Sequence, residues 1–312
     1  METRSLGPSG LKLTLVGLGC NNFGGRMDLA ATRTVVTHAL DLGINHFDTA
    51  DIYGGGGKSE EFLGEALGPR RKDIVLATKF GKPMPGSTVE RRGAAAYVAS
   101  AVDASLKRLK TDWIDLLWMH EPDPGTPIEA TLKALDGLIK AGKVRHVAAS
   151  NVSAAELDAA VKTAKRIGVE GFVGCQDELS LINRGIETSL LPKMQELGLG
   201  LVPYFPLGGG ALTGKYRKGQ SAIPQGRLNT GSGYSERFLG GDKFDTVEKL
   251  AAFAEARGRT LLELAMSWLA RKPMVASIIA GASKPEQLDA NVKATGWALS
   301  KAEMAEVEKL TG

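Results

Sequence analysis

Short apolar runs of strand length alternate with longer segments of helical periodicity along almost the whole chain. Most of these runs are apolar at successive positions, which is typical of parallel strands covered on both faces. The runs that we expect to form strands are residues 13–19, 44–49, 74–80, 114–120, 144–150, 172–179, 200–206 and 276–281. The pattern predicts an α/β protein built around a parallel sheet.

Segments with apolar positions at helical spacing lie between these strands, and several end at a glycine, as in LDLG, EALG and RIG. Glycine tolerates the left-handed conformation that commonly terminates a helix. The expected helices are residues 29–43, 59–68, 95–110, 128–142, 153–168, 187–198, 247–258, 260–272 and 284–296. Eight strand–helix units in one series predict a (β/α)8 TIM barrel, with a two-domain doubly wound fold as the alternative.

Two segments do not belong to a minimal barrel. Residues 4–19 hold two short strand-like pieces around a PSG turn, and we expect an N-terminal hairpin that closes one barrel end. Residues 207–244 form a long loop after strand seven, and loops of that length are uncommon unless they are functional. No linker or low-complexity segment divides the chain, so we interpret residues 1–312 as a single barrel domain.

Composition excludes several classes of protein. The 312 residues are 43% hydrophobic and 24% charged, as in ordinary globular proteins, and the net charge of +4 comes without a basic block, so we expect no nucleic-acid partner. No apolar run is long enough to cross a membrane, and the start lacks a signal core. Cys20 and Cys175 form neither a disulfide framework nor a C-x-x-C pair, so we expect buried thiols in a cytoplasmic protein.

Four titratable residues are expected at the carboxyl ends of strands, where barrel enzymes place their reactive groups. Asp48 closes one strand and Tyr53 follows in the next loop, Lys79 stands near the end of another strand, and His120 closes a third. Each alone has an ordinary structural explanation: a turn former, a rim aromatic, a solvated lysine or a core histidine. Together they suggest a common site at the barrel mouth.

The chemistry of these four residues is complementary. A buried Lys79 needs a carboxylate partner, which Asp48 could supply. An ammonium group beside Tyr53 favours the phenolate, so we expect the Tyr53 pKa to fall below its ordinary value of about 10 and the phenol to give a proton to a carbonyl oxygen. His120 could orient that oxygen by donating a hydrogen bond. A hydrolase that uses Asp48 and His120 is an alternative.

Longer motifs give a family resemblance. FDTADIYG, ATKF, the histidine that closes the fourth strand, ASN, PLGGGALTGKY and GASKPEQLDAN together resemble the aldo-keto reductase family over nearly the whole chain. The resemblance implies a barrel enzyme that reduces small aldehydes and ketones with NADP(H), with Asp48, Tyr53, Lys79 and His120 as its catalytic tetrad. Some relatives are regulatory subunits that bind NADPH and attach to a membrane channel, which is a second reading.

A Rossmann site is not expected, because GLGCNNFGG lacks the third glycine and opens no helix. A phosphate site is expected instead at GASKPEQL, where Ser283 and Glu286 have the spacing of a capping box and free N–H groups could bind an anion. Lys284 in the first helical turn opposes the helix dipole, and a bound phosphate would offset this.

The family resemblance extends to the rest of the cofactor. Ser150, Asn151 and Gln176 would hold the nicotinamide carboxamide, Tyr204 would stack on the ring, and the long loop would cover the pyrophosphate as a lid. Some branches have an arginine at position 287, so NADP preference would depend on Lys284 and Arg227. The expected cofactor contacts are Ser150, Asn151, Gln176, Tyr204, Leu207, Gly209, Lys215, Arg227, Gly281, Ser283, Lys284, Gln287 and Asn291.

The remaining candidates are weaker. His46 alternates with Asp48 on its strand, so we expect it inside the barrel, and no histidine pair has metal-ligand spacing, so we expect no metal. Phe23, Trp118, Met84 and residues of the long loop are expected at the rim of the substrate pocket.

Overall fold

Eight parallel strands form the centre of the molecule. The computed structural model describes the whole chain except residues 219–225, 227 and 229–232. The sheet order is β10-β3-β4-β5-β6-β7-β8-β9. These strands are β3 (Val16–Gly19), β4 (His46–Asp48), β5 (Val75–Phe80), β6 (Ile114–Met119), β7 (Val144–Ser150), β8 (Gly174–Glu178), β9 (Gly200–Tyr204) and β10 (Ile278–Gly281).

The ring of strands closes between β9 and the segment that leads into β10. Leu201 N–H donates to the Met274 carbonyl at 2.8 Å, and Ala276 N–H donates to the Leu201 carbonyl at 2.8 Å. The predicted α/β barrel is therefore confirmed.

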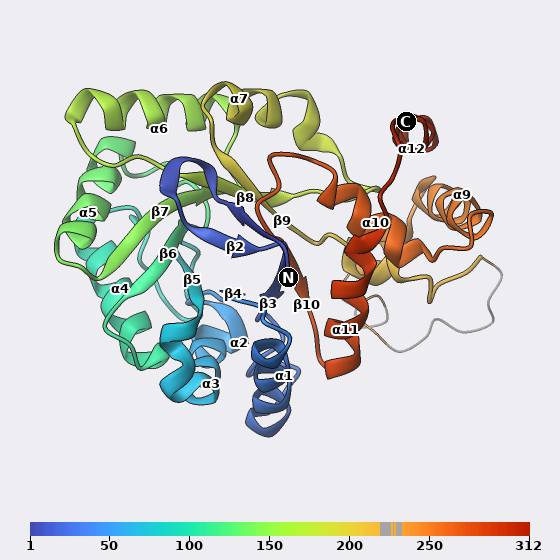
Figure 1. Cartoon of the computed structure of the whole chain (residues 1–312). Helices are drawn as coiled ribbons and strands as arrows, with labels where there is room; N and C mark the ends of the chain where they lie inside the picture. Colours follow the sequence, from blue (N-terminus) through green and yellow to red (C-terminus); the bar gives the residue numbers. More distant parts are fainter. Residues whose placement is uncertain (219–225, 227, 229–232) are drawn as a thin grey trace.

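Helices surround the strands, as Figure 1 shows. Those that follow barrel strands are α1 (Leu29–Asp41), α3 (Lys58–Leu67), α4 (Ala95–Leu109), α5 (Ile128–Lys140), α6 (Ala154–Ile167), α7 (Leu190–Glu196), α10 (Leu261–Ala270) and α11 (Pro285–Lys293). The others are the short α2 (Tyr53–Gly56) and α8 (Tyr234–Leu239), together with α9 (Lys243–Glu255) and α12 (Lys301–Thr311). Throughout the described part of the chain, every helix is too short or too polar to span a lipid bilayer.

The N-terminal hairpin lies across one end of the barrel. Its strands β1 (Thr3–Ser5) and β2 (Lys12–Thr14) pair antiparallel, and Figure 1 shows the hairpin over the middle of the ring. Leu6 and Leu13 are fully buried and pack on interior residues such as Leu116. The hairpin expectation is confirmed, although the strand expected at residues 13–19 is divided into β2 and β3.

The fit of the hairpin predicts a large effect at Gly7. This residue has φ +50°, and an added Cβ would lie 2.3 Å from the Val173 carbonyl oxygen. We expect Gly7→Ala to lower the free energy of unfolding by about 2–4 kcal/mol, because both the backbone conformation and the contact become strained. Gly10 is the matched control, since it has φ +73° with open space around it, and Gly10→Ala is expected to cost about 1 kcal/mol. Urea unfolding measures both, and equal losses would contradict the role of the contact.

Side chains alternate between the barrel interior and the helix layer. On β5 and β6, Ala77, Leu116 and Trp118 belong to the interior cluster, whereas Leu76 and Leu117 pack outward against helices. Because the period of a strand is two, the next inward positions after Ala77 and Trp118 fall at the carboxyl ends of these strands. The alternation therefore brings polar residues of several strands to one mouth of the barrel.

Candidate active site

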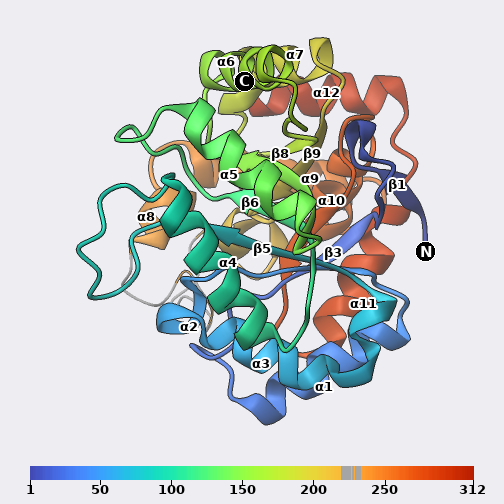
Figure 2. The ribbon, with the colours of Figure 1, turned by 90° about the vertical axis from the view of Figure 1, so that its left-hand side faces the viewer.

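The four predicted catalytic residues meet at the barrel mouth opposite the hairpin. Asp48, Lys79 and His120 each lie two residues beyond an interior side chain of their own strand, so all three point into the same opening. Tyr53 begins the short helix α2 in the loop after β4. Figure 2 shows α2 and the hairpin strand β1 at opposite ends of the molecule.

A buried ion pair forms the base of the site. Lys79 Nζ contacts Asp48 Oδ1, and their side chains are only 1% and 2% exposed. Lys79 Nζ also donates to the Thr49 carbonyl at 2.8 Å, and Gln176 Nε2 donates to Asp48 Oδ2 at 2.8 Å. The expectation that a buried lysine on this strand finds a carboxylate is confirmed.

The ion pair controls the charge of the lysine. Burial acts to lower the pKa of Lys79, but the neighbouring Asp48 and Tyr53 outweigh it and raise the pKa above its ordinary value. The ammonium is therefore charged at neutral pH. Lys79 Nζ lies 5.1 Å from the centre of the Tyr53 ring.

The expected lowering of the Tyr53 pKa is wrong for the chain by itself. Burial raises the pKa of Tyr53, and although the charge of Lys79 and a hydrogen bond from it act in the opposite direction, they do not reverse the effect. The reason is that desolvation penalises the phenolate more than one ammonium, itself neutralised by Asp48, can compensate. The phenol therefore keeps its proton at neutral pH, as a proton donor must.

His120 completes the wall beside the phenol. Its ring meets that of Tyr53 edge to face, with 5.9 Å between centroids and 87° between planes. Burial, followed by the charges of Lys79 and Lys82, lowers the pKa of His120 to about 2, so the imidazole is neutral. Its Nδ1 has no hydrogen-bond partner in the part of the chain described here. A neutral imidazole can donate a hydrogen bond to a carbonyl oxygen without competing with Tyr53 for the proton.

Polar residues at the ends of β7, β8 and β9 continue the mouth next to His120. Asn151 has φ +55°, and its Nδ2 donates to the His120 carbonyl at 2.8 Å and to Ser150 Oγ at 3.0 Å. Tyr204 OH donates to Asn151 Oδ1 at 2.7 Å. These predicted residues lie together beside the tetrad. Gln176 also lies there, but its amide nitrogen is already bonded to Asp48.

The expected capping box at the start of α11 is wrong. Lys284 occupies the N-cap and Pro285 the first helical position. The side-chain oxygen of Gln287, not that of Glu286, accepts the N–H groups of Ser283 at 2.7 Å and Lys284 at 3.3 Å. Because Pro285 takes the first helical position, the helix begins one residue later than an N-cap at Ser283 would require. The side chain of Gln287 therefore lies over the free N–H groups at the start of the helix. An anion bound here would take the place of the Gln287 carboxamide.

The remaining predicted cofactor residues are placed unevenly. Leu207 and Gly209 lie at the turn after β9, where Gly209 has φ +64°, and Lys215 follows on the same loop. Gly281 ends β10 and is exposed, whereas Asn291 on α11 is only 4% exposed. Arg227 lies outside the described residues.

A dinucleotide fits the donors at this mouth. Amides and hydroxyls can bond a carboxamide, while Ser283 and Lys284 can meet a phosphate. The unpaired Nδ1 of His120 adds an unused buried polar atom beside the tetrad.

Two of the expected rim residues are buried. Phe23 and Trp118 have no exposed surface, because Phe23 packs in the α1 layer and Trp118 fills the barrel interior. Met84 is half-buried, and its Cε lies 3.9 Å from where a Cβ on Gly56 would be, so it does stand beside the α2 loop. His46 is fully buried inside the barrel, as expected, with Nδ1 2.9 Å from Ser277 Oγ.

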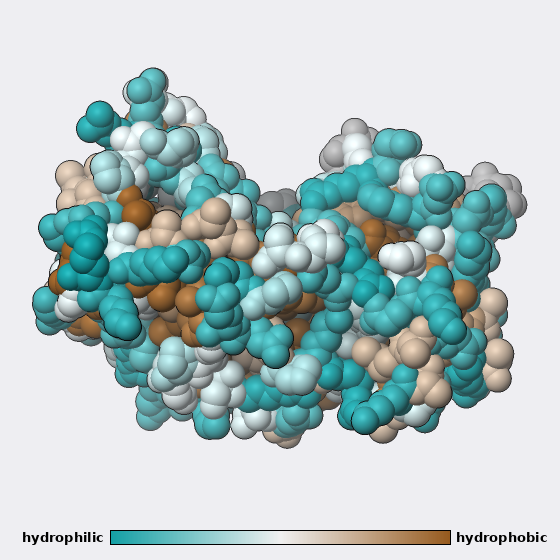
Figure 3. Space-filling model, turned by 90° about the horizontal axis from the view of Figure 1, so that it is seen from above, coloured by the Kyte–Doolittle hydropathy of each residue, from teal (hydrophilic) through white to brown (hydrophobic). Residues whose placement is uncertain are grey.

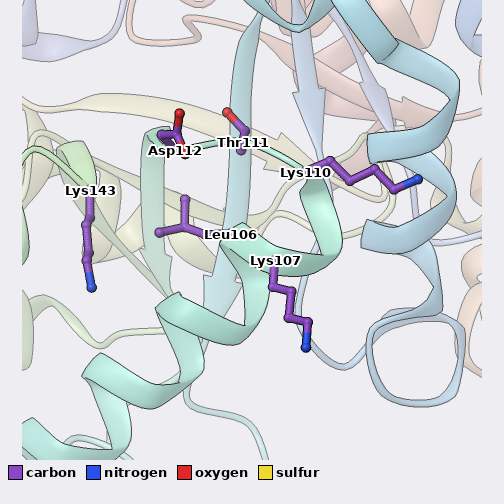
Figure 4. Close-up of a pocket in the computed structure, with 6 residues that line it drawn as sticks. All are labelled: Leu106, Lys107, Lys110, Thr111, Asp112 and Lys143. Carbon is purple, nitrogen blue, oxygen red and sulfur yellow. The ribbon is translucent and has the colours of Figure 1, made fainter.

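A surface hollow of about 420 Å³ lies elsewhere, at the amino-terminal ends of β6 and β7 (Figure 4). Its lysines do not converge on one point in Figure 4, and two of them have acidic partners: Lys110 with Glu65 and Lys143 with Asp103. The tetrad is at the other end of the barrel, so this hollow does not belong to the site.

Comparisons with known proteins agree with the motifs. The model of the aldo/keto reductase family matches residues 15–311. A probable voltage-gated potassium channel subunit beta of Arabidopsis thaliana is 36% identical, covering 94% of this chain and 91% of the relative. L-glyceraldehyde 3-phosphate reductase of Escherichia coli K12 is 33% identical, covering 99% and 92%. An uncharacterized oxidoreductase of Bacillus subtilis is also 33% identical, covering 96% and 93%. The resemblance expected from the motifs is confirmed.

Proposed function

This chain belongs to the aldo/keto reductase family, and from that premise we propose that it reduces aldehydes or ketones to alcohols with NADPH, using Tyr53 as the general acid. The observation that carries the proposal is the buried ion pair of Lys79 and Asp48 beneath the Tyr53 phenol. We also treat residues 1–312 as one domain, since the hairpin packs into the barrel that carries the site.

Each tetrad residue has a distinct task in the proposed reaction. Bound NADPH supplies the hydride. Tyr53 gives its proton to the carbonyl oxygen, and its burial keeps that proton in place until the oxygen gains charge. Lys79 stabilises the phenolate that remains, and Asp48 keeps Lys79 charged and oriented. His120 donates a hydrogen bond from a neutral ring and directs the carbonyl oxygen towards the phenol.

A second set of residues would hold the cofactor. Ser150, Asn151 and Gln176 would bind the carboxamide, and Tyr204 would pack on the nicotinamide ring. Ser283 and Lys284 at the start of α11 would meet the 2′-phosphate.

A carbonyl panel tests the proposal directly. Purified protein is incubated with aliphatic, aromatic and sugar-derived aldehydes and with ketones, and consumption of NADPH and of NADH is followed by absorbance. We expect turnover of several aldehydes with a preference for NADPH. Quenching of protein fluorescence by NADPH without any turnover would contradict the reductase and leave only a binding role.

Lys82 supports a preference for anionic aldehydes. It stands two residues beyond Phe80, whose carbonyl accepts the backbone N–H of His120 at 2.8 Å. After burial and the charge of Lys79, the charge of Lys82 also helps to lower the pKa of His120. Lys82 is half-buried and forms no ion pair within the described part of the chain. One relative is named for a phosphorylated aldehyde, L-glyceraldehyde 3-phosphate, so we propose short aldehydes that carry a phosphate or carboxylate as substrates.

Removing the Lys82 charge should therefore affect one class of substrate. We expect Lys82→Met to raise KM for glyceraldehyde 3-phosphate about 10-fold, which is the loss of one half-exposed charge contact, and to leave KM for glyceraldehyde unchanged. Steady-state kinetics on the two substrates measures the ratio, with Lys82→Arg as the charge-preserving control. Equal changes for both substrates would contradict anion recognition by Lys82.

A second candidate function is regulation of a membrane channel. It rests on the relative named as a probable voltage-gated potassium channel subunit beta. Among the described residues, however, the large hydrophobic side chains that are exposed are Met1 and Val89. Polar side chains dominate the face in Figure 3, where the hydrophobic areas are small and interrupted. Stable co-purification with a membrane protein, with no turnover of any carbonyl, would favour this function over the reductase.

A further inference from the structure

A second aspartate of the tyrosine loop is buried without a side-chain partner in the described part of the chain. Asp51 is 1% exposed, and within the described part of the chain no side chain donates a hydrogen bond to its carboxyl oxygens. The backbone N–H of the adjacent Ile52 is the donor that acts on its pKa. It stands two residues before Tyr53 and belongs to no step of the proposed reaction. A buried carboxylate with no side-chain donor is costly, so its presence here calls for a physical explanation.

The neighbouring acid takes the donors of this cluster. Glu60 on α3 is fully buried, and it accepts from Arg108 Nε at 2.7 Å and from Thr78 Oγ1 at 2.5 Å. The other Arg108 contact goes to Ser105 Oγ at 3.2 Å. One guanidinium therefore pairs with Glu60, and among the described residues a second negative charge on Asp51 would have no ion-pair partner of its own.

The charges around Asp51 come from three elements. Burial, followed by the charge of Glu60, raises the pKa of Asp51 to about 7, while Arg108 of α4, the backbone N–H of Ile52 and Lys79 of β5 act in the opposite direction. Burial raises the pKa of Tyr97 on α4, and the nearby charge of Asp51 adds to this rise. Asp51 consequently changes its charge near neutral pH, in the range where an enzyme works.

Asp51 also connects the tyrosine loop to the catalytic lysine. Its backbone N–H donates to the Lys79 carbonyl at 3.2 Å. Two residues earlier on each segment, the Thr49 N–H donates to the Ala77 carbonyl at 2.9 Å. These two bonds hold the loop along β5 and so set where the Tyr53 phenol stands. An anionic Asp51, repelled by Glu60, would be drawn towards water and would pull on this connection.

We propose that Asp51 is a positioning residue for Tyr53: its backbone N–H ties the loop to Lys79 of β5, and its buried carboxyl group must stay uncharged beside the Glu60 carboxylate for that connection to hold. Protonated Asp51 allows the loop to stay against β5, and ionisation loosens it. The activity would then fall as the pH rises through neutrality, before the phenol itself ionises. This effect on turnover rests on the proposed reductase activity, whereas the proton on Asp51 does not.

Asp51→Asn supplies an uncharged side chain of the same shape. We expect the wild-type kcat to fall with a midpoint near the Asp51 pKa of about 7, and the variant to keep its kcat until the pH at which Tyr53 ionises. At about pH 6 the two proteins should agree within about twofold, because both carry a neutral group at position 51. A midpoint that stays near neutrality in Asp51→Asn would overturn the proposal.

A matched control separates Asp51 from other buried acids. Asp177 on β8 also has a pKa raised by burial, to about 6, and Asp177→Asn should leave the wild-type midpoint where it is. Asp51→Ala is the second variant: its side chain carries no charge either, so its kcat should also show no midpoint near neutrality. If Asp51→Ala instead retains the wild-type profile, the carboxyl group is not the cause.

Thermal unfolding tests whether Asp51 is protonated in the folded protein, without depending on any turnover. The folded pKa of Asp51 is higher than the unfolded one, so its contribution to stability is full below about pH 4, the ordinary range of an aspartate, and is lost as the pH rises towards about 7. Wild type should therefore lose more of its melting temperature between these pH values than Asp51→Asn does. If the melting temperatures of wild type and Asp51→Asn change with pH in parallel, the proposal for Asp51 is overturned. If the two curves diverge but the protein reduces no carbonyl, the result counts against the proposed function alone.

Discussion

Tyr53→Phe is expected to reduce kcat for carbonyl reduction by about 10²–10⁴-fold, because the substitution removes the proton donor from the transition state. The ring of Tyr53 and its edge contact with His120 remain, so the shape of the mouth is preserved. Cofactor affinity should stay within about twofold, since the lost hydroxyl does not belong to the residues proposed to hold NADPH. Stopped-flow hydride transfer and fluorescence titration with NADPH measure the two quantities separately.

The matched control is another phenol on the same scaffold. Tyr97 lies half-buried on α4, outside the barrel, and Tyr97→Phe should leave kcat within about twofold of wild type. A Tyr53→Phe protein that turns over carbonyls at the wild-type rate would show that water or another residue donates the proton. A Tyr53→Phe protein that fails to bind NADPH would instead move the residue from chemistry to binding.

The sequence predicted the barrel because two independent signals agree. The apolar runs have the length of strands, and glycines terminate the intervening helices, as at Gly168 with φ +70° after α6. The period of a strand then places Asp48 above His46 and so at the mouth. The pattern missed the short helices α2 and α8. It also missed α12, although Ser300 accepts from Glu303 N–H in a capping box that the sequence does contain.

Properties that depend on packing could not be read from the sequence. Burial raises the pKa of Tyr53, and burial depends on how the loops pack. The family resemblance indicated only that the charge of Lys79 lies beside the phenol. The shift of the α11 cap from Glu286 to Gln287 follows from where Pro285 starts the helix. The roles of the cofactor residues remain predictions.

The sequence contains a sign of Asp51 that the motif analysis did not use. The motif FDTADIYG contains two aspartates, and only Asp48 has an obvious partner in the sequence. Strand alternation indicates that Thr78, next to Lys79, faces outward, and the helix layer there supplies Glu60 and Arg108. Only the packing of α3 and α4 on β5 shows that the donors of Thr78 and Arg108 bond to Glu60 and not to Asp51.

Breaking the ion pair at the base of the site is the second large effect that we expect. Lys79→Met leaves the Asp48 carboxylate buried with the Gln176 amide as its one remaining side-chain partner among the described residues, and Asp48→Asn leaves a buried ammonium. Each should lower the free energy of unfolding by about 3–5 kcal/mol, because a single charge in a dry site has lost its counter-ion. Urea unfolding measures both. The surface control Lys133→Met breaks an exposed pair with Glu129 and should have no measurable effect.

The double variant Asp48→Asn/Lys79→Met distinguishes the stability of the pair from its use in catalysis. With both charges removed, the loss of stability should shrink to about 1–2 kcal/mol, well below the sum of the single losses, because no uncompensated charge remains. Its kcat should stay as low as that of Lys79→Met, because the group that stabilises the Tyr53 phenolate is missing in both. Stability losses that simply add would mean that Lys79 and Asp48 are not coupled. Recovered stability without recovered turnover would mean that the chain keeps two charges in its interior for the proton transfer, since a neutral pair holds the fold nearly as well.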